Sequence, residues 1–170
     1  MIDAGAEADI ISGGTGADNL TGGAGADTFT GFSLEDQSVV ASAHTFNDDG
    51  DDLIVNSETI TFATGSAGSV DVITDFVSGT DKLDVTNADT APTNLINVDS
   101  TSALSDGSGY LLYGSYVATT GVFTAATGYD ATNSNDAIFV EGDGTETAIT
   151  ETDYVVLLDL NQALVSTDFI

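Results

Sequence analysis

The sequence predicts an all-β fold: a short parallel β-roll capped by, and continuous with, an antiparallel, sandwich-like C-terminal part. Three observations lead to this prediction. They are a nine-residue repeat at the start of the chain, alternating strands between Gly, Asp and Asn turns further on, and no convincing helical spacing in the second half. Gly, Ala, Thr, Ser, Asp and Val dominate the composition, as is typical of strands and turns. We expect the roll with its cap in residues 1–85 and the antiparallel part in residues 86–170.

The net charge is the most unusual property of the chain. Its 170 residues include 28 acidic residues and one basic residue, Lys82, so the formal net charge at pH 7 is −27. Self-repulsion at this density opposes compaction, and cations from solution must do the neutralising. Nucleic acid and anionic membrane surfaces are excluded as partners, because binding to either depends on Lys and Arg. A salt-adapted or merely soluble acidic protein is the alternative explanation of the charge taken alone.

Cysteine is absent, so disulfides do not hold the fold together. This is common in the cytosol and also among proteins that are exported without an oxidative folding step. No apolar run approaches the roughly 20 residues of a membrane-spanning helix, and no basic-then-apolar signal peptide follows Met1. We therefore expect no insertion into a membrane.

A nine-residue period organises the first thirty residues. Asp9, Asp18 and Asp27 are nine residues apart, and a large apolar residue stands two positions after each of them. Six residues of each unit predict a tight turn, in which glycines supply the positive φ angles. The next three predict a short strand whose middle side chain points inward. The units read A-G-A-E-A-D-I-I-S from Ala4, G-G-T-G-A-D-N-L-T from Gly13 and G-G-A-G-A-D-T-F-T from Gly22, and the inward side chains are Ile11, Leu20 and Phe29.

The pattern G-G-x-G-x-D-x-U-x, where U is a large apolar residue, resembles the calcium-binding nonapeptide repeat of RTX proteins. The resemblance implies a Ca²⁺ ion between turns on the same side of the roll, two repeats apart, held by carbonyl and carboxylate oxygens. Asp9 and Asp27 are then expected to share one ion, and Asp18 to share another with Asp36. A Gly-rich linker with coincidental aspartates is the alternative, which two consecutive near-perfect units argue against. The expected oxygen donors of the repeats are Asp9, Gly13, Thr15, Asp18, Gly22, Ala24 and Asp27.

The repeat returns further along the chain, at N-D-D-G-D-D-L-I-V from Asn47 to Val55. Asn47, Asp49 and Asp52 are candidate calcium ligands there, with a solvated acidic turn as the alternative. Asp52 is out of phase with the first repeats, so we expect an excursion from the roll in between. A short helix and an irregular crossover are both open for residues 33–43.

Residues 70–85 read V-D-V-I-T-D-F-V-S-G-T-D-K-L-D-V, with a strand predicted over Val70–Phe76. They resemble the segment that closes the β-roll in RTX proteins, including the C-terminal domain of serralysin-type proteases. The resemblance implies that this segment caps the roll and supplies further carboxylates to calcium. An ordinary hairpin with solvent-facing acids is the alternative. The candidate carboxylates are Asp71, Asp75, Asp81 and Asp84.

Alternating apolar residues between turn residues predict the remaining strands. The tyrosines at positions 110, 113 and 116 are expected in the core and on the sheet face rather than as a binding platform. The ending T-D-F-I, Thr167–Ile170, resembles the uncleaved C-terminal export signal of type I secretion substrates in the RTX family. The predicted strands are Glu58–Phe62, Tyr110–Val117, Val122–Thr124, Ala137–Val140 and Tyr154–Leu160.

No motif for catalysis is found in the sequence. His44 is the single histidine and is expected in a loop. The H-E-x-x-H zinc site, the G-x-S-x-G elbow and a phosphate loop with Lys are all missing. We therefore expect that this chain is not an enzyme.

The resemblance implies a secreted calcium-binding structural module, located outside the cell or at its surface. Carboxylate repulsion is expected to keep the repeats open where calcium is scarce, and calcium outside the cell to condense them. The parent protein is expected to be surface-layer or adhesin-like. The alternative is the export and folding domain of a secreted RTX protease or lipase. The expected partners are calcium ions and the type I secretion apparatus, with self-association or a cell-surface glycan as further candidates.

Overall fold

The computed structural model describes residues 1–14, 16–31, 44–46, 59–62, 70–85, 92–94, 108–142 and 154–170. These ranges contain strands and one short 3-10 helix but no α-helix, which confirms the all-β prediction. None of their helical structure is long and apolar enough to cross a membrane. The elements are β1 (Ile2–Asp3), β2 (Ile10–Ser12), β3 (Asn19–Thr21), β4 (Thr28–Thr30), β5 (His44–Phe46), β6 (Thr59–Phe62), β7 (Asp71–Ile73), β8 (Lys82–Leu83), β9 (Thr93–Asn94), β10 (Ser108–Val117), β11 (Val122–Ala125), β12 (Asp136–Gly142), β13 (Tyr154–Leu157) and η1 (Ser166–Asp168).

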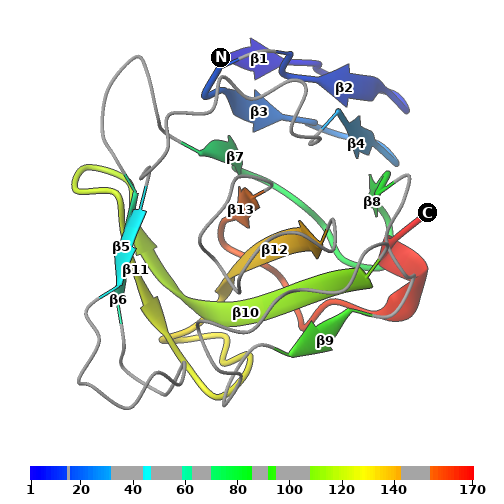
Figure 1. The fold of residues 1–170 in the computed structure, drawn as a ribbon. Helices are drawn as coiled ribbons and strands as arrows, with labels where there is room; N and C mark the ends of the chain where they lie inside the picture. The colour runs from blue at the N-terminus through cyan, green and yellow to red at the C-terminus, as the bar shows by residue number, and fades with distance from the viewer. Residues whose placement is uncertain are drawn as a thin grey trace.

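The N-terminal repeats wind into a parallel β-roll (Figure 1). β1 pairs with β3 and β2 pairs with β4, both in parallel, so successive strands alternate between two sheets. The pairing register equals two repeat units, since Ile11 lies opposite Phe29. Ile11, Leu20 and Phe29 are buried between the sheets, as their place in the repeat predicts.

Gly23 shows why the turns require glycine. Its φ is 94°, and a Cβ atom there would collide with the carbonyl oxygen of Gly5 in the turn above. The two turns are joined by backbone hydrogen bonds, including one of 2.8 Å from Ala24 N to Gly5 O. Glu7 occupies the place that a glycine takes in the other units and still adopts a φ of 96°. The imperfect first unit therefore keeps the turn conformation of the others.

Residues 70–85 return to the roll and close it. β7 pairs in parallel with β3, and β8 pairs in parallel with β4. The strand predicted over Val70–Phe76 is too long, because β7 ends at Ile73. The chain turns there because the Asp75 carboxylate accepts hydrogen bonds from the turn glycines of the roll. Phe76 enters the core beside Phe29, with ring centroids 6.0 Å apart.

One sheet of the roll continues into the C-terminal part of the chain. β7 pairs in parallel with β13, and antiparallel pairing then connects β13, β12, β10, β11, β6 and β5. β9 pairs with β10 beside this path. Figure 1 shows the roll lying across one end of the larger sheet, so the predicted continuity of the two parts is confirmed. The predicted division at residues 85 and 86 stays a prediction.

The larger sheet is buried on both faces by two hydrophobic clusters. The first joins the roll to the sheet, since it contains Leu20 and Phe29 together with Phe139 of β12. The second covers the opposite face and contains Ile138 of the same strand. Tyr113 belongs to the first cluster, and Tyr110 and Tyr116 pack against the second. These tyrosines contribute to the core and the sheet face, as expected.

The other predicted strands are present as β6, β10, β11, β12 and β13, with small differences at their ends. β13 ends at Leu157 rather than Leu160, because Asp159 takes a φ of 51° and its N–H donates to Asp136. His44 was expected in a loop but is the first residue of β5, where it pairs with Phe62 of β6.

The last residues of the chain extend the smaller sheet, β2–β4–β8. Phe169 forms a parallel bridge with Leu83 of β8. Ile170 N donates to Leu83 O over 3.0 Å, and Val85 N donates to Ile170 O over 2.9 Å. The residues that resemble an export signal are therefore part of the folded structure.

Candidate metal centre

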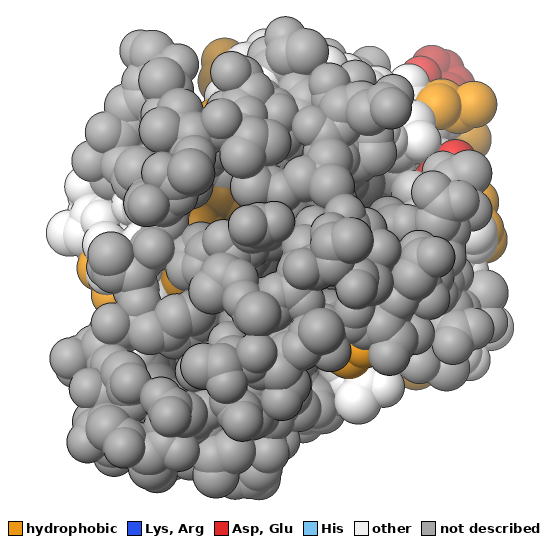
Figure 2. Space-filling view, viewed as in Figure 1, with side chains coloured by type: hydrophobic (Ala, Val, Ile, Leu, Met, Phe, Trp, Pro, Cys, Tyr) orange, Lys and Arg blue, Asp and Glu red, His pale blue; other side chains and the backbone are white. Residues whose placement is uncertain are grey.

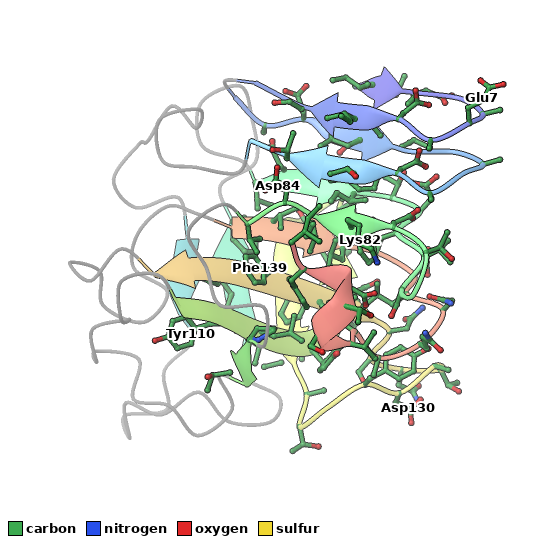
Figure 3. The ribbon with its side chains drawn as sticks, turned by 90° about the vertical axis from the view of Figure 1, so that its right-hand side faces the viewer. Glu7, Lys82, Asp84, Tyr110, Asp130 and Phe139 are labelled. Atoms are coloured by element: carbon green, nitrogen blue, oxygen red, sulfur yellow. The ribbon has the colours of Figure 1, made fainter. Side chains whose placement is uncertain are left out.

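The aspartates that end the turns stack in two columns, one on each side of the roll. Successive turns lie on opposite sides of the roll, because every turn connects a strand of one sheet to the next strand in the other sheet. We call Asp9, Asp27 and Asp81 the Asp27 column, and Asp18 with Asp71 the Asp18 column. The side that carries Glu7 is that of the Asp27 column, since Glu7 belongs to the turn before Asp9 (Figure 3).

Each column is held together by a ladder of backbone-to-carboxylate hydrogen bonds. The N–H of Asp9 donates to Oδ1 of Asp27 over 2.9 Å, and the N–H of Asp27 donates to Oδ1 of Asp81 over 3.0 Å. The N–H of Asp18 donates to Oδ1 of Asp71 over 2.8 Å. In each pair, one oxygen of the accepting carboxylate is thus fixed by a hydrogen bond. This sets the direction of the second oxygen of the same carboxylate.

In the Asp27 column, the second carboxylate oxygens of Asp9 and Asp27 are buried without a donor among the described residues. Oδ2 of Asp9 and Oδ2 of Asp27 have no hydrogen-bond partner among the described residues, and only 1% of Asp27 is exposed. A buried carboxylate oxygen costs free energy unless a donor or a cation compensates it. The protein supplies no such compensation for these two atoms within the described part of the chain.

The carboxyl group of Asp81 has a raised pKa. Burial raises the pKa of its carboxyl above the ordinary value of 3.8, although hydrogen bonds from the N–H groups of Asp27 and Val77 lower it in part. The negative charge of Asp27 raises this pKa further. A cation between these carboxylates would act in the opposite direction and favour their ionised forms.

Glycines leave open space beside the carboxylates. A Cβ atom at Gly22 would collide with Oδ2 of Asp27. A Cβ atom at Gly13 would lie 3.2 Å from Oδ2 of Asp18 and 3.4 Å from Oδ2 of Asp71, so these two oxygens face the same small space. Both columns therefore bring carboxylate oxygens against a backbone position that lacks a side chain.

This arrangement fits a hard divalent cation such as Ca²⁺. Ca²⁺ takes six to eight oxygen ligands, including carboxylates and backbone carbonyls. No group of three or more acidic, His or Cys side chains that could hold a metal is present in the described ranges. Backbone carbonyls of the turns would have to complete the ligand set, as the repeat pattern implies.

The structure brings together most of the predicted site residues that it describes. Asp9, Asp27 and Asp81 meet in one column, with Gly22 beside them, and Ala24 lies in the same turn. Asp18 and Asp71 meet in the other, with Gly13 beside them. Their roles as ligands stay predictions. Thr15, Asp36, Asn47, Asp49 and Asp52 lie outside the described residues.

Asp71 is the described neighbour of Asp18, because β7 pairs with β3. The expected partner Asp36 lies outside the described residues, so its pairing with Asp18 stays a prediction. Asp75 differs from the other candidates, because its oxygens accept hydrogen bonds of 2.9 and 2.7 Å from Gly22 N and Gly23 N. It caps the N–H groups of the last regular turn.

Two buried aspartates were not predicted from the sequence. Asp168 is fully buried and accepts hydrogen bonds from Ser78 and Gly79 of the closing segment. Asp136 is buried at the start of β12 and accepts from Tyr116 N and Asp159 N. Their partners are distant in the sequence, and the only local signal was the place of Asp168 in the T-D-F-I ending.

Charge on the visible surface is acidic as well. In the space-filling view, the described charged side chains that can be seen are Asp or Glu, at the upper right where the roll ends (Figure 2). The N-terminal amine forms an exposed ion pair with Asp18 over 3.3 Å. With 28 acidic residues and one basic residue in the sequence, protein cations cannot balance the charge.

Comparison with known proteins agrees with this geometry. Residues 2–31 match the family model described as the RTX calcium-binding nonapeptide repeat (4 copies). No curated protein matches the chain. The N-terminal segment therefore carries RTX repeats, which bind calcium ions and are typical of secreted proteins.

Proposed function

We propose that this chain is a secreted, non-catalytic structural module that folds when calcium binds between its stacked turns. The observation that carries the proposal is the Asp27 column. There, two buried carboxylate oxygens lack a hydrogen-bond donor within the described residues and lie in turns that match a calcium-binding repeat. These buried oxygens require a positive charge nearby, and none of the described residues supplies it.

Calcium binding and folding are coupled in this proposal. The columns join residues far apart in the sequence, such as Asp18 with Asp71, so the sites do not exist in an extended chain. Binding free energy at such sites becomes folding free energy. Without calcium, the buried carboxylates and a net charge of −27 oppose the roll.

Export before folding follows from the same coupling. The chain stays open in a cytoplasm with little calcium, which suits passage through a type I secretion apparatus. In the folded chain Asp168 and Phe169 are buried, so a receptor could read them only before the chain folds. This supports an order in which the C-terminal residues are recognised first and packed against the roll afterwards.

Circular dichroism tests the coupling. Wild-type protein in a chelator should show low strand content, and about 1 mM calcium should restore it, whereas magnesium at the same concentration should be much less effective because it favours a small octahedral site. Strand content that is identical in chelator and in calcium would contradict the proposal.

The role in the parent protein is proposed to be that of a surface-layer or adhesin-like component. The absence of catalytic motifs from the sequence, together with its richness in Thr, Ala and Gly, supports a structural role of this kind. Electron microscopy after addition of calcium distinguishes this role from its alternative. Ordered sheets or filaments support a surface component, whereas a strictly monomeric product supports the folding domain of a secreted RTX protease or lipase.

A further inference from the structure

The C-terminal segment 161–170 wraps around the turn that carries Asp81. Ser78 at the top of this turn is buried and contacts the segment at several points. Its N–H donates to Asn161 Oδ1 over 3.0 Å, and its carbonyl oxygen accepts from Gln162 Nε2 over 3.1 Å. Figure 3 shows the C-terminal segment, in red, beneath the closing end of the roll near Lys82.

Asp168 is the centre of this contact. Its side chain is fully buried, with 0% exposed. Oδ2 accepts hydrogen bonds of 2.6 Å from Ser78 Oγ and 2.9 Å from Val165 N, and Oδ1 accepts one of 2.7 Å from Gly79 N. Hydrogen bonds to a buried carboxylate are stronger than those between neutral groups. One side chain thus fixes two consecutive residues of the turn.

The same turn positions Asp81, which belongs to the Asp27 column. Asp81 N and Thr80 N both donate to Val77 O, which closes the turn, and Val77 N donates to Oδ2 of Asp81 over 2.8 Å. The other oxygen of Asp81 accepts from Asp27 N. Gly79 has a φ of 86°, a conformation that most residues avoid and that the Asp168 hydrogen bond holds in place. Asp81, whose carboxylate orders Asp27, therefore lies three positions after Ser78, with two residues between them.

We propose that Asp168 is a positioning residue for calcium binding in the Asp27 column, and that docking of the segment 161–170 and binding of calcium in this column strengthen each other. The inference rests on the proposed function, because it requires that the column binds calcium. Its physical basis is reciprocal coupling: if docking of the segment raises calcium affinity, calcium raises the stability of docking by the same factor.

The proposal is specific to one side of the roll. The Asp18 column lies in the turn between β2 and β3 and at the start of β7. The turn that Asp168 holds is on the other side, between β7 and β8. Loss of Asp168 should therefore weaken one column and spare the other, whereas a general loss of stability would affect both. The calcium affinity of the Asp18 column is therefore the internal control for that of the Asp27 column.

Site-resolved calcium titration tests this difference. The backbone amide signals of Asp27 and Asp18 report the two columns separately in NMR spectra, since each N–H donates within its own column. In Asp168→Asn, calcium affinity reported by Asp27 should fall at least about fivefold, with little change at Asp18. Asp159→Asn removes the same charge from an exposed position and should change neither affinity.

A second variant and a reverse measurement complete the test. Ser78→Ala removes one of the three hydrogen bonds to Asp168 and should give a smaller loss of calcium affinity, again confined to the Asp27 column. If Asp168→Asn does not fold, Ser78→Ala provides the test in its place. In the reverse direction, hydrogen exchange of the Ile170 amide, which donates to Leu83 O, should accelerate more in Asp27→Asn than in Asp18→Asn.

Each outcome has a definite meaning. A wild-type protein that binds no calcium at either column contradicts the proposed function itself. Calcium binding at both columns in the wild type, with equal losses or no loss in both Asp168→Asn and Ser78→Ala, contradicts the positioning role alone. A loss confined to the Asp27 column, together with faster Ile170 exchange in Asp27→Asn, supports it.

Discussion

Asp27 illustrates how a single residue links local sequence to the proposed calcium site. Its N–H donates to Asp81, its Oδ1 accepts from Asp9 N, and its Oδ2 is buried without a donor within the described residues. The two hydrogen bonds organise the column, and Oδ2 is left for a cation. In the proposed function the same side chain is therefore unfavourable in a calcium-free fold and favourable in a calcium-bound one.

This dual role predicts that Asp27→Asn has opposite effects with and without calcium. In saturating calcium the variant should be less stable and should bind calcium about tenfold or more weakly, because a charged ligand is lost. In calcium-free buffer any residual structure should be more stable than in the wild type, by about 1 kcal/mol, because a buried charge is removed. Urea unfolding under both conditions measures this, with exposed Asp3→Asn as the control. Destabilisation of equal size in both buffers would be evidence against a metal at Asp27.

Gly22 makes a second prediction about a single residue. In Gly22→Ala the new Cβ would collide with Oδ2 of Asp27, and the backbone at this position needs no positive φ. The carboxylate must move, so calcium affinity of the Asp27 column should fall about tenfold, which corresponds to 1.4 kcal/mol. Gly128→Ala is the matched control, because a Cβ there meets nothing within 4 Å. Isothermal titration calorimetry compares the calcium affinities of the two variants. Equal affinities would show that the open space at Gly22 is not needed for calcium binding.

At the scale of elements, the roll could be predicted from sequence where its interactions are local. The period of nine residues predicted the turns, the strands and the buried position of Leu20, because each unit repeats the same short-range geometry. The partner of Asp18 could not be predicted in this way. The described neighbour of Asp18 is Asp71 of β7, which is 53 residues away. No local pattern specifies which distant segment returns to a sheet edge.

The hydrogen bonds of Asp168 near the C-terminus could not be predicted for a similar reason. T-D-F-I suggested an export signal, but its sequence does not show that Asp168 meets Ser78, 90 residues away in the chain. β7 was predicted too long because the alternation of Val70–Phe76 continues past Ile73, whereas the hydrogen bonds of Asp75 to the roll turn the chain there. In each case a tertiary contact decided what the local pattern left open.

The strands of the roll depend on the cluster that joins them to the larger sheet. Phe29 of β4 is fully buried in this cluster, beside Phe76. Phe29→Ala should cost about 3–5 kcal/mol in calcium-bound protein, and it should raise the calcium concentration needed for folding. Ile10→Ala in the neighbouring strand should cost little, because 82% of Ile10 is exposed. Thermal unfolding in calcium compares the two variants, and similar losses would contradict the assignment of the core.

At the scale of the whole molecule, pH should act in opposite directions with and without calcium. The pKa of Asp81 is raised by burial, so its stabilising contribution is present below 3.8 and is lost as pH rises through the raised value. Calcium-free protein should therefore gain stability as pH falls from 7 towards 4, helped by a smaller net charge. Calcium-bound protein should lose stability over this range, because protons compete with the metal for carboxylates. Strand content against pH without calcium, from circular dichroism, and urea midpoints against pH with calcium measure the two trends; trends of the same sign would refute the coupling.

The most direct test of the account is a high-resolution electron-density map of crystals grown in calcium, with anomalous scattering used to locate the metal. If both columns bind calcium, metal peaks should appear on both sides of the roll, in contact with Oδ2 of Asp27 in one column and with the carboxylates of Asp18 and Asp71 in the other. A map with Asp27 and Asp18 facing ordered water only, and no anomalous peak beside either, would contradict it.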